Sequence, residues 1–192
     1  MSELSRMSIA SDERTILKVL DDLVSQRGVR QELDLTVSRL EAKLDADRSS
    51  LLVWEPVDLS LYGGPIPDGV RSSWVFVLRA NTVSGAERHP NSIQRVMSFR
   101  GSADLQTQRG EQPGGVWTSN YLVSEPTAPL EDRWLSIPTG VWHQGVMSGE
   151  NWVVVSFHTV LAQDLIEERP ASKAGETVQR TYIPPGGERE LG

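Results

Sequence analysis

Short apolar runs that alternate with turn-forming residues fill the chain between residues 50 and 160, and they constrain its fold more than any other feature. Each run has the length of a β-strand, and Gly, Pro, Asn and Ser residues separate it from the next run. Many short strands joined by turns are typical of a β-sandwich or a β-barrel. The runs that we interpret as strands include Leu51–Trp54, Trp74–Leu78, Ile93–Phe99 and Trp152–Val160.

The N-terminal quarter has a helical pattern instead. Ser11 and Asp12 can cap a first amphipathic helix, which we expect to end at Gly28, and a second helix follows from Val29. Each helix must bury its apolar stripe. We expect the two helices to pack on an outer face of the sheet or on each other, and a dimer interface is the alternative.

These strand-like and helical sequence patterns divide the chain into three parts. Residues 1–48 form a helical extension, residues 49–162 form the β-barrel, and residues 163–192 form a C-terminal segment. The sequence predicts a short helix from Leu161 to Arg169 in this last region, because Pro170 would end it. We expect an extended or poorly ordered tail beyond that helix.

Two distant segments carry residues that suit a metal site. Glu87 and His89 are two residues apart, so a strand would place both side chains on one face. Gln94 follows a Pro-Asn-Ser turn and can return on a neighbouring strand, and His143 can complete the set from a distant strand. Two imidazoles and one carboxylate form the facial arrangement that leaves open positions on an Fe(II)-type metal.

The first segment resembles the first motif of the cupin superfamily. That motif reads His, any residue, His, three or four residues, Glu, six residues, Gly. Glu87 stands at the first His of the motif, His89 at the second, Gln94 at the Glu and Gly101 at the closing Gly.

The second segment resembles the second cupin motif, which reads Pro, any residue, Gly, two residues, His, three residues, Asn. Pro138, Gly140 and His143 match it, and Met147 stands at the Asn. The resemblance covers roughly residues 50–160, and it implies a mainly β fold, a cupin-type double-stranded β-helix barrel (jelly roll).

The resemblance also implies that Glu87, His89, Gln94 and His143 occupy the ligand positions for a divalent metal ion (Fe, Mn, Ni or Zn). Glu87 and Gln94 replace residues that the motif expects. A glutamate is a competent ligand, whereas a glutamine is neutral and binds a metal less well. Gln94 can coordinate the metal through its amide oxygen, or it can orient a ligand or a bound water molecule.

Strand alternation predicts further residues of the pocket. If Gln94 points inward, Ser98 and Arg100 share its face, and Met147 shares the face of His143. We expect these three residues to contact a substrate, with Arg100 as a partner for a carboxylate or phosphate. A surface ion pair is the alternative for Arg100.

His158 ends the apolar run that begins at Trp152. It can lie near the barrel mouth as a substrate contact, a further ligand or a proton carrier. The alternative is a partly exposed histidine at the end of a strand.

Composition excludes several classes of function. The net charge of −7, without a basic stripe, argues against a nucleic-acid surface. The absence of cysteine excludes disulfides, thiolate catalysis and cysteine-based zinc sites. The N-terminal residues lack the apolar core of a signal peptide, and no apolar stretch approaches the roughly 20 residues that span a bilayer. We therefore expect a cytoplasmic protein. The resemblance to cupin barrels, which often pair through edge strands or sheet faces, implies a homodimer, and the pocket residues predicted above imply a small-molecule ligand.

Two classes of function agree with these observations. The first is a metal-dependent enzyme, either an oxidoreductase of the non-haem iron dioxygenase type or an isomerase or lyase that uses the metal as a Lewis acid. The second is a ligand-binding or sensing module without turnover. A metal-free barrel in which Glu87 or His143 is the general base is a third alternative.

Overall fold

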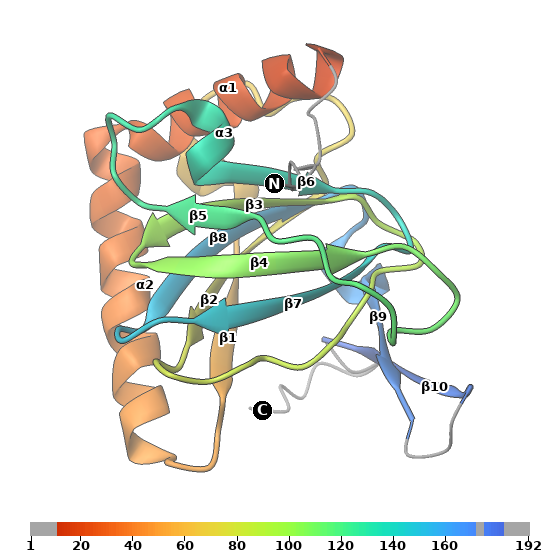
Figure 1. Cartoon of the computed structure of the whole chain (residues 1–192). Helices are drawn as coiled ribbons and strands as arrows, with labels where there is room; N and C mark the ends of the chain where they lie inside the picture. The colour runs from red at the N-terminus through yellow and green to blue at the C-terminus, as the bar shows by residue number, and fades with distance from the viewer. Residues whose placement is uncertain (1–10, 172–174, 183–192) are drawn as a thin grey trace.

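The computed structural model describes residues 11–171 and 175–182 and confirms a mainly β protein with N-terminal helices (Figure 1). The described strands are β1 (Leu52–Val57), β2 (Ser72–Leu78), β3 (Gln94–Arg100), β4 (Ser102–Gln108), β5 (Tyr121–Val123), β6 (Trp134–Ile137), β7 (Trp142–Met147), β8 (Trp152–His158), β9 (Ile166–Pro170) and β10 (Thr177–Thr181). The helices are α1 (Ser11–Ser25), α2 (Arg27–Ala46), α3 (Leu130–Arg133) and two 3-10 turns, η1 (Leu59–Tyr62) and η2 (Ala162–Asp164).

The strands form two facing sheets with the strand order of a jelly roll. One sheet has the order β1-β2-β8-β3-β6, and the other contains β5-β4-β7. Residues 83–89 lie along the free side of β7 through the bridges Val83–Val146 and Glu87–His143. The chain therefore alternates between a β2-β8-β3-β6 layer and an (83–89)-β7-β4-β5 layer, with β1 as an added edge strand. This topology confirms the expected cupin-type barrel.

Gly101 makes the tight connection by which β3 crosses from one sheet to β4 in the other. Its φ angle is 77°, and a Cβ atom at this position would lie 2.7 Å from the backbone oxygen of Asn151. Only glycine fits both the left-handed conformation and the close approach. The motif spacing that singled out Gly101 therefore has a steric reason.

The two N-terminal helices cover the outer face of the five-stranded sheet (Figure 1). Their apolar stripes, which include Leu17 and Leu33, pack with Val75 and Val153 in one buried cluster, so the expected packing on a sheet face is confirmed. The break between the helices falls at Gln26 rather than at Gly28, which lies in the first turn of α2. None of the described helices is long and apolar enough to cross a membrane.

The predicted helix from Leu161 to Arg169 is wrong. The segment forms the short turn η2 and then the strand β9, which pairs with β10. The backbones of Arg88 and Glu168 also exchange two hydrogen bonds, of 3.0 and 2.9 Å. Strand β9 therefore extends the sheet that contains β5, β4, β7 and residues 83–89. These sheet partners satisfy the backbone of the segment better than an isolated two-turn helix would.

Candidate metal centre

Strand register brings Glu87, His89 and His143 together. Glu87 lies directly opposite His143, and their backbones exchange hydrogen bonds of 2.9 and 2.8 Å. His89 follows two residues later on the same face, and its ring centroid lies 5.4 Å from that of His143. One potential ligand atom from each of the three side chains lies within 4.8 Å of the others. The cluster could therefore hold a metal ion.

The two imidazole rings are oriented as metal ligands are. His89 Nδ1 donates to the carbonyl oxygen of Ile166 at 2.9 Å, and His143 Nδ1 donates to that of Val141 at 3.2 Å. Each ring in its neutral form therefore keeps a lone pair on Nε2. Both Nε2 atoms are buried. His89 Nε2 has no hydrogen-bond partner within the described residues, and His143 Nε2 lies 3.4 Å from Glu87 Oε1. A backbone carbonyl on one nitrogen and a free lone pair on the other are typical of metal-binding histidines.

Gln94 faces this cluster from the opposite sheet. It is the first residue of β3, it lines the same pocket as Glu87 and His143, and its Oε1 atom is buried. In the part of the chain that the structure describes, Oε1 has no hydrogen-bond partner. The free donor atoms at this end of the pocket therefore fit a divalent ion, with Gln94 as a neutral fourth contact or as a partner for a bound water molecule.

Arg169 of β9 forms an ion pair with Glu87 through Oε2, the carboxylate oxygen that does not contact His143. Its Nη2 lies 2.5 Å from Glu87 Oε2, its Nη1 donates to the Ser84 carbonyl at 3.1 Å, and its Nε contacts Glu167. Burial opposes ionisation of Glu87. The hydrogen bond and charge of His143, with the charge of Arg169, outweigh burial and lower the pKa of Glu87 to about 2. Glu87 is therefore a carboxylate at neutral pH.

His89 is neutral at the same pH. Its burial, followed by the nearby charge of His143, lowers its pKa to about 4. A neutral imidazole is the form that binds a metal.

The shifted pKa of His89 predicts that the metal-free protein loses stability in mild acid. The folded-state pKa of about 4 lies below the ordinary value of 6.5, so the unfolded chain takes up the proton first as the pH falls. This effect is absent above about pH 6.5 and grows until about pH 4. Between pH 7.5 and 5 we expect His89 alone to lower the free energy of unfolding by about 2 kcal/mol.

Urea unfolding of the metal-free protein at the two pH values measures this loss. A His89→Gln variant should lose distinctly less stability over the same range, because Gln does not titrate. An equal loss in both proteins would contradict the pKa assignment.

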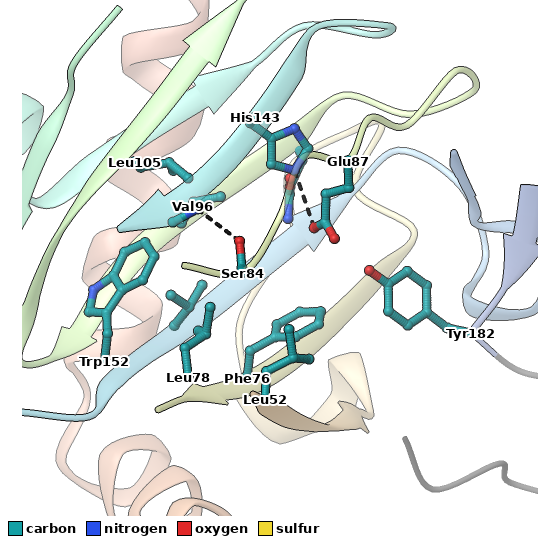
Figure 2. Close-up of a pocket in the computed structure, with 13 residues that line it drawn as sticks. Leu52, Phe76, Leu78, Ser84, Glu87, Val96, Leu105, His143, Trp152 and Tyr182 are labelled. Atoms are coloured by element: carbon teal, nitrogen blue, oxygen red, sulfur yellow. Dashed lines mark hydrogen bonds and ion pairs between the residues drawn. The ribbon is translucent and has the colours of Figure 1, made fainter. Parts of the chain in front are cut away.

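The cluster lies at one end of a pocket of about 50 Å³. Figure 2 shows Glu87 and His143 at this end, with the hydroxyl of Tyr182 directed toward Glu87. Trp152, Leu78 and other apolar side chains line the opposite end. A pocket with its polar groups gathered at one end binds and orients a small molecule.

The residues expected to contact a substrate lie outside the pocket lining. Arg100 points to α2, where it pairs with Asp34 at 2.9 Å and Glu41 at 3.3 Å, because a bulge between Ser98 and Arg100 reverses the alternation of β3. The expectation of an inward Arg100 was therefore wrong. Ser98 accepts a hydrogen bond of 2.8 Å from Trp152 Nε1. Ser98 therefore fixes the orientation of Trp152, which lines the pocket.

Met147 is buried beside that wall, on the same face of β7 as His143 and Gly145. Its sulfur lies 3.1 Å from the position that a Cβ atom of Gly145 would take. Met147 therefore limits the space near the apolar end without lining it.

His158 is fully buried, so the alternative of a partly exposed histidine was wrong. Its ring stands perpendicular to that of His89 at a centroid distance of 5.1 Å. Its two ring nitrogens hydrogen-bond Ser92 and Ser156, each at 3.3 Å. His158 thus supports His89 from behind and does not reach the metal-ligand cluster.

Two residues of the site were not found from the sequence. Arg169 and Tyr182 lie in the C-terminal segment that we expected to be a helix and a tail. The ring of Tyr182 packs against Trp54 and Trp74, each at a centroid distance of 5.4 Å, and this packing fixes it at the pocket. The β-branched residues Thr177, Val178 and Thr181, just before Tyr182, were the available signal for a strand.

No protein-family model matches the sequence, and no curated protein matches it either. Among solved structures, an oxalate oxidase in complex with glycolate is 19% identical, with a TM-score of 0.41 over 58% of this chain and 53% of that one. The coconut allergen cocosin is 13% identical, with a TM-score of 0.40 over 58% of this chain and 24% of the allergen.

The capsular polysaccharide assembling protein CapF from Staphylococcus aureus is 11% identical, with a TM-score of 0.40 over 49% of this chain and 24% of CapF. This chain thus spans only about a quarter to a half of the length of these proteins. Their functions do not transfer to it at this level of similarity. The strand order is that of a jelly-roll barrel, and Glu87, His89 and His143, which stand at positions of the cupin-like motifs, come together in it.

Proposed function

We propose that this protein is a metal-dependent cupin that acts on a small organic molecule. The observation that carries the proposal is the convergence of Glu87, His89 and His143 at the polar end of a small pocket, where His89 Nε2 is buried without a hydrogen-bond partner in the described chain. These three residues would hold one divalent ion, and Gln94 would face it from the other sheet.

Such an ion supplies open coordination positions for dioxygenase-type chemistry if it is Fe(II), or Lewis acidity for an isomerase or lyase if it is redox-inert. The protein's own residues orient the site. Arg169 fixes the carboxylate of Glu87, and the carbonyl groups of Ile166 and Val141 fix the two imidazoles. The apolar lining limits the access of water to the reacting group.

Tyr182 faces the site, and its hydroxyl already hydrogen-bonds the side chain of Glu167, so its oxygen is suited to accept a hydrogen bond from a substrate. Burial, followed by the charges of Glu87 and Glu167, raises its pKa well above the ordinary value. The phenol therefore stays protonated at neutral pH. Its hydroxyl points to the metal end of the pocket (Figure 2), where a substrate oxygen would lie.

A ligand-binding role without turnover is the second candidate. The specific observation that favours it is Gln94, because this neutral residue is a poorer ligand than the glutamate that the motif expects and leaves three strong ligands instead of four. Both candidates require the same metal and the same pocket.

Reconstitution of metal-free protein with Mn(II), Fe(II) or Zn(II) tests the proposal. After dialysis, we expect about one metal ion per chain by elemental mass spectrometry. With Mn(II), enhanced relaxation of water protons would show a coordination position open to solvent. Failure to retain any of these ions would contradict the metal-dependent function. Ligand binding without conversion across candidate substrates would favour the non-catalytic role.

A further inference from the structure

Polar and apolar groups are separated along the length of the pocket. The only charged side chain among its lining residues is Glu87, and it lies at the metal end. The remote half is formed by Leu78, Leu105, Trp152 and neighbouring apolar side chains (Figure 2). A ligand with a charged group at both ends would leave one charge without a partner in this half.

The polar atoms close to the remote half are already engaged. Trp152 Nε1 donates to Ser98 Oγ at 2.8 Å, so the indole presents only carbon to the pocket. The hydroxyl of Ser84 accepts a hydrogen bond from the Gly145 amide at 2.9 Å and donates to the Gly85 carbonyl at 3.2 Å. The groups that remain free for a ligand are therefore concentrated at the metal end.

Gly145 keeps the remote half open. It lies on β7, two residues beyond His143, and a Cβ atom here would lie 3.1 Å from Met147 Sδ and 3.3 Å from Trp152 Cζ3. Its φ angle lies outside the left-handed region, so the backbone does not require glycine. A glycine inside a strand can mark a place where a ligand approaches closely.

We propose that the pocket takes a small molecule with an oxygen-bearing, metal-binding head and a short apolar arm, and that Gly145 sets the length of the arm. The inference rests on the proposed metal site. The whole pocket measures only about 50 Å³. The arm is therefore short, and molecules with carboxylates at both ends are excluded.

Alkyl hydroxamates test the inference, because they bind metals through a constant head and differ only in the arm. Binding of aceto-, propiono- and butyrohydroxamate to the Zn(II)-loaded protein is measured by calorimetry. We expect the affinity to rise about threefold to fourfold for each added methylene that the pocket buries. In Gly145→Ala, acetohydroxamate should bind within about twofold of the parent, whereas butyrohydroxamate should bind at least about tenfold more weakly.

Gly149→Ala is the matched control, because a Cβ atom at Gly149 meets nothing within 4 Å and its φ angle is also outside the left-handed region. It should leave the whole series unchanged. If Gly145→Ala fails to fold, Leu105→Ala replaces it, and its added space should move the tightest binding to a longer arm.

The outcomes separate the inference from the proposed function. Binding of acetohydroxamate with no gain along the series, or equal losses for all three probes in Gly145→Ala, would overturn the inference and leave the metal site standing. A protein that takes up no Zn(II) would overturn the proposed function. It would also overturn the inference that the ligand has a metal-binding head.

Discussion

Replacing His89 and His143 together by alanine is expected to weaken divalent-metal binding by more than about 100-fold and to leave the barrel folded. Loss of a residue that only hydrogen-bonds a metal ligand already costs about 10–100-fold, and here two ligands are removed. The variant loses the Nδ1 hydrogen bonds to the carbonyl groups of Ile166 and Val141 and the contact of His143 with Glu87, but the two apolar clusters of the barrel stay intact. Metal titration followed by elemental analysis measures the effect, and circular dichroism checks the fold.

Gln144→Ala is the matched control for this experiment. Gln144 follows His143 on β7 but points to the opposite face, where its side chain donates to Gln106 at 2.9 Å. The control should bind metal as the parent does. Equal metal binding in the double histidine variant would show that the ion is held elsewhere.

Replacing Arg169 by methionine is expected to lower the free energy of unfolding of the metal-free protein by about 3 kcal/mol. Arg169 contacts the carboxylates of both Glu87 and Glu167, and Glu167 is fully buried. Removing one partner of a buried ion pair leaves an uncompensated charge, which costs about 3–5 kcal/mol. Denaturant unfolding of the metal-free proteins measures the difference.

Arg180→Met separates the role of Glu87 from that of Glu167. Arg180 also pairs with Glu167, at 2.7 Å, but it is 47% exposed and its side chain does not pair with Glu87. We expect a loss below about 1 kcal/mol for this control. A divalent ion should stabilise Arg169→Met more than the parent, because it would supply the positive charge missing at Glu87. Similar losses in the two variants, with no difference in stabilisation by metal, would contradict the assigned role of Arg169.

Much of the barrel could be predicted from local sequence. Apolar runs such as Trp74–Leu78 lie in strands, and Gly101, which the motif spacing singled out, lies at a tight connection between two strands. Strand length depends on a few adjacent residues, and the turn at Gly101 depends on a backbone conformation that only glycine adopts easily. Such features can be read without knowing what lies across the fold.

The ligand cluster could be predicted in part for a similar reason. Glu87 and His89 share a face because they are two residues apart on an extended segment. His143 was placed with them by motif spacing, and the bridge between Glu87 and His143 agrees with that placement. Whether these residues bind a metal stays a prediction.

Strand alternation did not predict the direction of the Arg100 side chain. Regular alternation predicted an inward side chain, but a bulge in the pairing of β3 with β8 turned it toward the acidic residues of α2. The bulge arises from the fit between two strands that are far apart in sequence. Nothing in residues 94–100 alone indicates it.

The sequence by itself determined a mainly β domain with short strands, because strand periodicity and turn chemistry act over a few residues, and the spacing of the cupin-like motifs placed His143 with Glu87 and His89. Only the tertiary structure decided that β9 lies beside residues 83–89 and that Arg169, 82 residues away in sequence, contacts Glu87. It also decided that Tyr182 and Gly145 shape the pocket. The physical reason is that such contacts depend on which distant backbones pair, and local propensity leaves that pairing open.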